Sequence, residues 1–371
     1  MKADEFDGYF KDAYKAKAPK FEDHVNIAIV GKVSTGKSSV LNAILDRPRS
    51  DPIAKVGAQS GITTKITPYQ LDDNVLIIDC PGLDDIRQEN SEATKKFLKA
   101  IDLGIFVVTG SADASQKANF DDVRASCHKT IVVLNKRDEW DDLEESAFDA
   151  VIAQWKVVLG VTQVFAACTK GYDPKMRKDA PMDIRGIDQI KTEIFDFLET
   201  AGKDILLARH VKNKNEYCVK IIVAALAAVA AEAFIPGSAA YITATQVVAI
   251  TSINYLYTGE VLNKGSALAL LPTFAGQSAG MTAFLWAKSF LPPTGIVDLA
   301  AAGIAVVITF AMLAAVKWML ENGHALDQAE LLKKAFGTYK DVGGAFSKAS
   351  MSDFKSTAKL SKLVGTLLHK K

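Results

Sequence analysis

Apolar and polar positions alternate along the first 200 residues in a pattern typical of a layered α/β domain. Short apolar runs at 25–30, 75–80, 103–110, 130–136 and 161–168 are separated by stretches with helical periodicity. Runs that are apolar throughout are typical of parallel strands that are covered on both faces. The pattern therefore predicts a mostly parallel sheet sandwiched by helices.

The second half of the chain has a different pattern. Strand-like alternation ends after residue 203, and only six residues between 221 and 320 are charged. Alanine-rich helical sequence dominates there, which predicts an all-α hydrophobic domain. We expect three parts: an N-terminal amphipathic helix at 1–21 that packs on the helical domain, an α/β domain at 22–202, and the helical domain at 203–371, which ends in a basic amphipathic helix.

Charge is divided unevenly between the two halves. The net charge is +1, but residues 1–200 carry 27 basic and 33 acidic side chains, whereas residues 201–371 carry 17 and 10. The basic half is also the apolar half, which favours anionic lipid as a partner over nucleic acid. Four cysteines without regular spacing and a charged N-terminus without an apolar core indicate a cytoplasmic protein. We expect it to be peripheral or integral at the cytoplasmic face of a membrane.

A phosphate-binding loop follows the first apolar run. The sequence GKVSTGKSS at 31–39 has the GxxxxGKS spacing and precedes a helical pattern. In such a loop the backbone N–H groups surround a phosphate, a lysine neutralises its β and γ oxygens, and a hydroxyl binds Mg²⁺. The expected nucleotide-binding residues are those at the end of the loop: Ser34, Thr35, Gly36, Lys37, Ser38 and Ser39.

Two further segments are expected to complete a magnesium site with Ser38. Asp79 and Gly82 form a DxxG sequence at the end of the second strand, where the carboxylate would hold the metal and the Gly82 N–H would contact the γ-phosphate. The segment GITTK at 61–65 lies between the phosphate-binding loop and the DxxG sequence, and one threonine hydroxyl there would bind the metal. Thr64 is preferred over Thr63 because it stands directly before the basic residue.

A base-reading box follows the fourth apolar run. Asn135, Lys136 and Asp138 form NKxD. A carboxylate that accepts hydrogen bonds from guanine N1–H and from the 2-amino group is left unpaired by adenine, so the box predicts GTP and GDP as ligands. Lys136 would stack on the base and Asn135 would connect this loop to the phosphate loop. Ala167 and Cys168 are expected near guanine O6; the alternative for Cys168 is a small buried residue at the end of a strand.

These motifs together carry a family resemblance. GKVSTGKSSVLNAIL, GITTK, DCPGL and NKRD resemble the translation-factor-related GTPases of the Era, TrmE, septin and dynamin branch, over residues 22–200. The helical half is similar to the domain of unknown function in YcjF-like GTPases, and the layout is similar to that of immunity-related GTPases. The resemblance implies a P-loop GTPase that hydrolyses GTP with Mg²⁺.

The group that orients the hydrolytic water is an open question in the sequence. Leu83 stands where Ras-like members have a glutamine, and leucine cannot orient water. Ser34 occupies the position at which Era- and TrmE-like members have a potassium-coordinating asparagine. We expect Ser34 to help hold K⁺, Na⁺ or a group from a second copy; the alternative is a serine that only bonds its own loop. Catalytic roles are therefore expected for Lys37, Thr64, Gly82 and Ser34, with slow intrinsic turnover.

The helical half leaves two interpretations open. Residues 299–316 form an uncharged run of 18 residues, barely long enough to span a bilayer. These helices either form a bundle or insert into a membrane. The leading hypothesis is a GTPase whose nucleotide state controls membrane association or oligomerisation, including a nucleotide-dependent homodimer. The alternative is a soluble switch that binds a protein effector.

Overall fold

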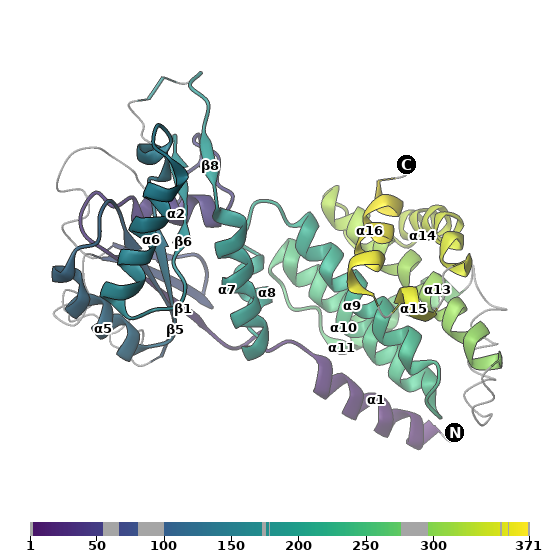
Figure 1. Ribbon diagram of the computed structural model, residues 1–371. Helices are drawn as coiled ribbons and strands as arrows, with labels where there is room; N and C mark the ends of the chain where they lie inside the picture. The colour runs from purple at the N-terminus through teal and green to yellow at the C-terminus, as the bar shows by residue number, and fades with distance from the viewer. Residues whose placement is uncertain are drawn as a thin grey trace. The chain divides into compact units, whose positions relative to one another are not determined.

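The computed structural model describes residues 3–54, 67–80, 100–172, 176–177, 179–275, 296–348, 351–354 and 356–369. The chain forms two compact units (Figure 1). Residues 20–212 form the nucleotide unit, and residues 1–19 together with 213–371 form the helical unit. The helical unit is therefore assembled from both ends of the chain.

Within the described part of the nucleotide unit, six strands form a central sheet in the order β2-β3-β1-β4-β5-β6. All neighbouring strands are parallel except β2 and β3, which are antiparallel. This confirms the prediction of a mostly parallel sheet. The strands are β1 (Val25–Val30), β2 (Thr67–Gln70), β3 (Val75–Cys80), β4 (Ile101–Val108), β5 (Cys127–Leu134) and β6 (Phe165–Ala166).

The last apolar run departs from its expected form. Instead of one strand over 161–168, only the two-residue β6 joins the main sheet. The chain then leaves the sheet, and β7 (Cys168–Lys170) pairs with β8 (Asp183–Arg185) as a separate antiparallel ribbon. This ribbon carries a segment of twelve residues between its strands, which contributes to the site described below.

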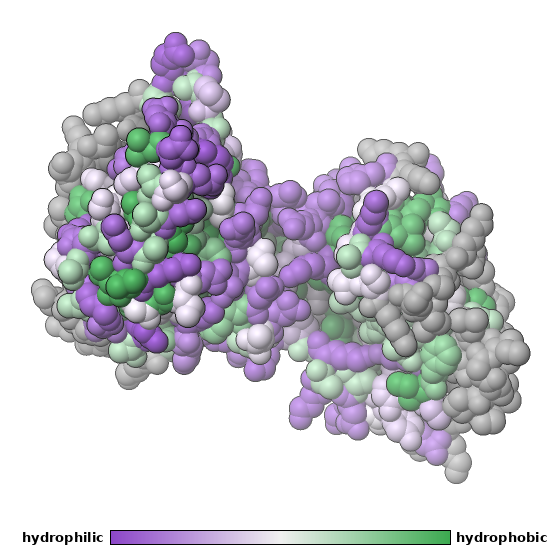
Figure 2. Space-filling model, viewed as in Figure 1, coloured by the Kyte–Doolittle hydropathy of each residue, from purple (hydrophilic) through white to green (hydrophobic). Residues whose placement is uncertain are grey.

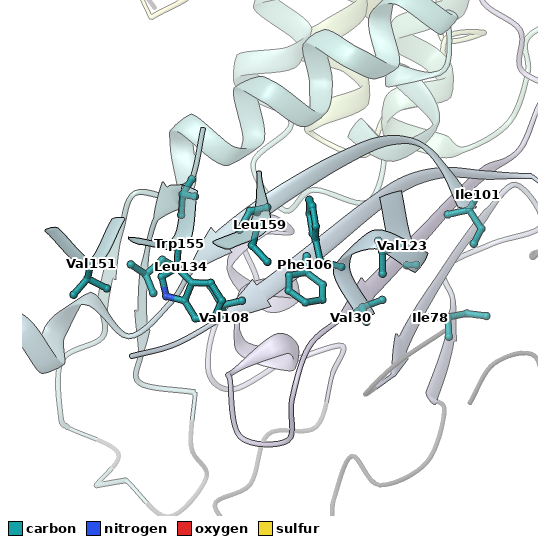
Figure 3. Packing of buried hydrophobic residues seen from close by; sticks show 14 of the residues in the cluster. Val30, Ile78, Ile101, Phe106, Val108, Val123, Leu134, Val151, Trp155 and Leu159 are labelled. Atoms are coloured by element: carbon teal, nitrogen blue, oxygen red, sulfur yellow. The ribbon is translucent and has the colours of Figure 1, made fainter. Parts of the chain in front are cut away.

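Helices cover the sheet and enclose its core. Trp155, Phe106, Val108 and Leu134 lie together in one buried cluster (Figure 3). Trp155 is fully buried and donates from Nε1 to the Gly110 carbonyl at 2.9 Å. The helical elements of this unit are α2 (Lys37–Ile44), the 3₁₀ turns η1 (Ala114–Gln116) and η2 (Arg137–Trp140), α5 (Lys117–Ser126), α6 (Glu145–Leu159), α7 (Ile187–Ala201) and α8 (Asp204–Ala208).

The helical unit is a bundle around one apolar helix, α13. Within it α13 packs against α14, α9 and α10, α16 packs against α9, and α1 lies along α10. The elements are α1 (Ala3–Lys17), α9 (Asn215–Glu232), α10 (Ser238–Thr258), α11 (Lys264–Ala275), α13 (Ile296–Glu321), α14 (Ala329–Gly343), the 3₁₀ turn η3 (Gly344–Lys348), α15 (Met351–Phe354) and α16 (Thr357–Leu368).

The apolar faces of this unit point mainly inward. Among the described helices, one segment, Ala300–Glu321, is long and apolar enough to cross a membrane, but 83% of its most apolar window is buried in the bundle. In α16, Leu360, Val364 and Leu367 are buried as well. The visible surface of the unit accordingly carries hydrophilic side chains interspersed with apolar ones (Figure 2). Burial of this extent is typical of a core helix in a bundle. Length and apolar composition alone do not distinguish such a helix from one that spans a membrane.

The N-terminal helix is held on α9, α10 and α11 by apolar and charged contacts. Phe10 is buried, and the Lys264 ammonium lies 4.5 Å from the centre of its ring. At the end of α1, Lys17 forms an ion pair with the buried Glu232 and donates to the Thr245 hydroxyl at 2.5 Å. A charge as buried as that of Glu232 needs such partners, so these contacts fix the end of α1.

Candidate nucleotide-binding site

The phosphate loop connects β1 to α2 and depends on two close backbone approaches. Gly36 has φ +86°, and a Cβ there would lie 2.3 Å from Asn135 Nδ2. A Cβ on Gly31 would lie 2.2 Å from the Val107 carbonyl oxygen. Ser34 also has positive φ, at +69°, and its side chain is exposed. Glycine is required at 31 and 36 because any side chain would meet a neighbouring strand or loop.

Lys37 lies folded into this loop. Its side chain is buried, and Nζ donates to the carbonyl oxygens of Gly31 at 3.0 Å and Lys32 at 3.2 Å. Thr35 is also buried, and its hydroxyl donates to the Lys32 carbonyl at 2.9 Å. The ammonium group is thus held inside the loop by backbone carbonyl oxygens, so the loop carries a positive charge of the kind that phosphate binding requires.

Asp79 and Ser38 are hydrogen-bonded to each other beside the loop. Ser38 Oγ donates to Asp79 Oδ2 at 2.8 Å, and Asp79 is fully buried at the end of β3. Burial raises the pKa of Asp79, while Lys37, 3.9 Å from Oδ1, and the Ser38 hydroxyl act in the opposite direction. Among the described residues no hydrogen-bond donor reaches Asp79 Oδ1. A buried carboxylate oxygen with spare acceptor capacity beside a hydroxyl fits the oxygen ligands that Mg²⁺ prefers.

Asn135 joins the base-reading loop to the phosphate loop. Its Nδ2 donates to the Thr35 carbonyl at 3.0 Å, and its Oδ1 accepts from the Thr169 hydroxyl at 3.0 Å. Asn135 is almost completely buried, so both bonds are shielded from water. Asn135 therefore connects three segments that are far apart in the sequence.

Asp138 carries its carboxylate into the same region. Its Oδ1 accepts from the Cys168 thiol at 3.4 Å, and its Oδ2 lies 3.2 Å from Lys170 Nζ. Burial raises the pKa of the Cys168 thiol to about 11, so the thiol remains a protonated donor to Asp138. Lys136, in a left-handed conformation at φ +63°, pairs with Glu139 at 3.5 Å.

Residues from these segments line one pocket of about 220 Å³. Of the expected residues it brings together Gly36, Ser39, Asn135, Lys136 and Asp138. It is also lined by residues that the motifs do not include: Glu139, Thr169, Lys170, Gly171, Tyr172 and Met176. No motif marks Tyr172 or Met176, because both lie in the segment of twelve residues between β7 and β8, whose path depends on tertiary contacts.

Ala167 departs from its expected position. Its N–H donates to the Leu134 carbonyl at 2.8 Å, and its carbonyl accepts from the Arg137 N–H at 3.0 Å. Both backbone groups are thus used within the fold, and the pocket is lined instead by Thr169 and Lys170. The expected residues Thr63, Thr64, Gly82 and Leu83 lie outside the described residues.

Comparison with known proteins agrees with this geometry. Residues 26–136 match the family model described as 50S ribosome-binding GTPase. The chain is 29% identical over 146 residues to GTPase Der from Nitratiruptor, a match that covers 36% of this chain and 30% of that protein. It is 23% identical over 203 residues to the tRNA modification GTPase MnmE from Alkaliphilus metalliredigens, covering 52% and 39%. The chain thus spans about a third of the length of these relatives.

Solved structures give more distant matches. Toc33 from Arabidopsis thaliana, in complex with GDP and Mg²⁺, is 17% identical with a TM-score of 0.32, covering 53% of this chain and 91% of that one. The G domain of the FeoB iron transporter from T. maritima is 16% identical with a TM-score of 0.27, covering 47% and 98%. Residues 20–212 thus have the mostly parallel sheet and the phosphate loop that are typical of a P-loop GTPase domain, and they are similar in sequence to parts of Der and MnmE.

Proposed function

We propose that this protein binds GTP and hydrolyses it to GDP and phosphate. The observation that carries the proposal is a pocket that is lined both by Gly36 and Ser39 of the phosphate loop and by the base-reading residues Asn135 and Asp138. In hydrolysis, water adds to the γ-phosphorus, the bond from that phosphorus to the β–γ bridging oxygen breaks, and a proton leaves the water.

The chain's own residues supply positioning and charge. Lys37 would neutralise the β and γ oxygens, and Ser38 with Asp79 would hold Mg²⁺. The ion, when bound, supplies positive charge to the phosphate oxygens. Asp138 would accept from guanine N1–H and the 2-amino group, with its orientation fixed by Cys168. Thr64 and Gly82 are proposed for the metal and the γ-phosphate from their order in the sequence.

Calorimetry with the purified protein tests this function. In the presence of Mg²⁺ we expect GDP and a non-hydrolysable GTP analogue to bind, and ADP to show no heat of binding at the same concentrations. The 2-amino group and N1–H of guanine give this preference, because adenine leaves the Asp138 carboxylate unpaired. Binding of ADP but not GDP, or of neither, would overturn the proposal.

Ser34 is proposed as the residue that compensates for the absent glutamine. Its exposed side chain and left-handed backbone place it at the surface of the phosphate loop, where K⁺, Na⁺ or a second copy can approach. Turnover is expected to be faster in K⁺ than in Na⁺, and Ser34→Ala should abolish the difference. Val33→Ala is a matched control, because Val33 is also exposed on the loop. Equal rates in both salts and in all variants would exclude the role.

We also propose that nucleotide state reaches the helical unit through the turn between β2 and β3. At this turn Asp72 Oδ2 accepts from Arg209 at 2.8 Å and lies 3.0 Å from His210 Nε2. These two residues stand just before position 212, where the chain leaves the nucleotide unit.

The same turn holds the other chain connection. Asn74 Nδ2 donates to the carbonyl oxygens of Asp23 at 2.8 Å and Phe21 at 3.2 Å, just after position 20, where the chain enters the nucleotide unit. Strand β3 leads from this turn to Asp79 in the proposed magnesium site. A shift of β3 on nucleotide exchange would therefore move both connections together.

Hydrogen exchange tests this coupling. The amides of α1 and α10 should exchange at different rates with GDP and with a GTP analogue, and Asp72→Asn should reduce the difference because it weakens the contact with Arg209. Asp73→Asn removes the same charge from the neighbouring exposed position and serves as the control. If Asp72→Asn and Asp73→Asn give the same exchange difference as the unmodified protein, this turn does not carry the signal.

For the role of the helical unit, we propose oligomerisation or binding of a protein effector in preference to membrane association. Burial of α13 and of the apolar face of α16 supports this order, because lipid insertion would require both to leave the bundle. Flotation with anionic liposomes and sedimentation in each nucleotide state separate the outputs. Flotation in either state would favour the membrane role instead, at the cytoplasmic face.

A further inference from the structure

The nucleotide pocket has a second wall that belongs to neither the phosphate nor the guanine motif. Gly171, Tyr172 and Met176 line it, and all three come from the segment between β7 and β8. Gly171 has φ +126°, and a Cβ there would lie 2.8 Å from the Met182 side chain. The chain therefore needs glycine to turn at the point where this wall begins.

Two arginines that follow α2 hold the wall in place. Arg49 donates from its two terminal nitrogens to the carbonyl oxygens of Arg177 and Ala180, each at 2.8 Å. The Tyr172 hydroxyl donates to the Arg47 carbonyl at 2.9 Å, and Tyr172 is 5% exposed. The Arg49 guanidinium thus holds the chain at the first and the fourth residue after Met176, because its planar group carries several donors in a fixed fork.

The Tyr172 hydroxyl is a donor under all physiological conditions. Burial, followed by the nearby Asp46 carboxylate, raises the pKa of Tyr172 to about 12. The phenol therefore keeps its proton and its bond to Arg47. The wall is held from two directions: by Tyr172 at its beginning and by Arg49 beyond Met176.

We propose that Arg49 is a positioning residue that sets how long a nucleotide stays bound. By clamping the chain after Met176, it keeps Met176 and Tyr172 in the wall of the pocket that Ser39 and Asp138 also line. A flexible, polarisable methionine packs well on a flat aromatic ring such as a purine. This inference rests on the proposed function, since it assumes that guanine nucleotide occupies the pocket.

Nucleotide release tests the role of Arg49. For Arg49→Met we expect GDP to dissociate about tenfold faster, since the variant loses two charge-assisted bonds that hold the wall. For Arg49→Lys, which has a single ammonium group in place of a forked guanidinium, the GDP dissociation rate should lie between the rates of the unmodified protein and of Arg49→Met. The preference for GDP over ADP should not change, because Asp138 determines it. Arg177→Ala is the matched control: Arg49 uses only the Arg177 backbone carbonyl, and the Arg177 side chain is 82% exposed.

A double-mutant cycle with Met176→Ala distinguishes positioning from general stability. Met176→Ala alone should also speed release, and Arg49→Met should then add little, since its effect acts through Met176. Additive effects, or release unchanged by Arg49→Met in a protein that still binds GDP, would overturn the inference. Failure of the unmodified protein to bind GDP would instead overturn the proposed function. Thermal unfolding of each variant shows whether it has folded, and Met176→Ala keeps the test valid if Arg49→Met does not fold.

Discussion

Replacing Asp138 by asparagine should exchange guanine for xanthine as the preferred base. The carboxylate would accept two hydrogen bonds from guanine, and a bond to a charged group contributes about 1.5–3 kcal/mol. Asparagine presents an amide N–H where the carboxylate had an acceptor, so it faces the 2-amino group donor to donor. The loss of about 3–6 kcal/mol corresponds to roughly a 100- to 20,000-fold weaker affinity for GDP.

The fold itself should tolerate Asp138→Asn. The Lys170 side chain that pairs with Asp138 is 55% exposed, and an exposed pair contributes about 0–1 kcal/mol. XDP carries a carbonyl oxygen where GDP has the 2-amino group, so the asparagine N–H can donate to it. The variant should therefore bind XDP more tightly than GDP.

The assay is calorimetric titration of the variant with GDP and with XDP in the presence of Mg²⁺. Glu139→Gln is the control: Glu139 lines the same pocket and its loss removes the same charge, but its side chain is 54% exposed and pairs with Lys136. The reasoning is refuted if Asp138→Asn weakens GDP and XDP equally, or if Glu139→Gln reproduces the exchange.

Three further predictions concern stability, each measured by circular dichroism on the full chain. Gly104→Ala should cost about 1–3 kcal/mol, because its Cβ would lie 2.6 Å from the Val123 side chain; an unchanged melting temperature would contradict this. Trp155→Phe should cost about 2 kcal/mol through the lost bond to Gly110 and a smaller ring. Burial raises the pKa of Cys218 to about 12, so its contribution to stability is complete below pH 9 and lost as the pH rises toward 12; Cys218→Ala should flatten this decline.

The sequence was informative wherever a backbone requirement or a long apolar run specifies the structure. The parallel strands followed from runs such as 25–30, since strands buried on both faces are apolar throughout. Gly31 and Gly36 were identifiable from the GxxxxGKS spacing, which requires glycine at both positions because the loop leaves no room for a side chain. The P-loop class then followed from motif order.

Features that depend on tertiary contacts could not be predicted in this way. A backbone N–H from the segment of Ala167 and Cys168 was expected near guanine O6, but the N–H of Ala167 donates to the Leu134 carbonyl within the fold. The wall residues Tyr172 and Met176 carry no local signal, since Arg49, more than 120 positions earlier, helps to place their segment. The septin and dynamin branch and the likeness of the helical half to YcjF-like and immunity-related GTPases stay predictions.

The helical unit joins the first helix of the chain to helices that begin only at residue 215. During synthesis from the N-terminus, Phe10 and Lys17 leave the ribosome long before Glu232, at the end of α9, and helix α10 exist to cover them. The nucleotide unit, by contrast, is continuous and can fold as soon as residue 212 has emerged. Closure of α1 onto α10 is thus a late event that takes place only after the domain between them has been completed.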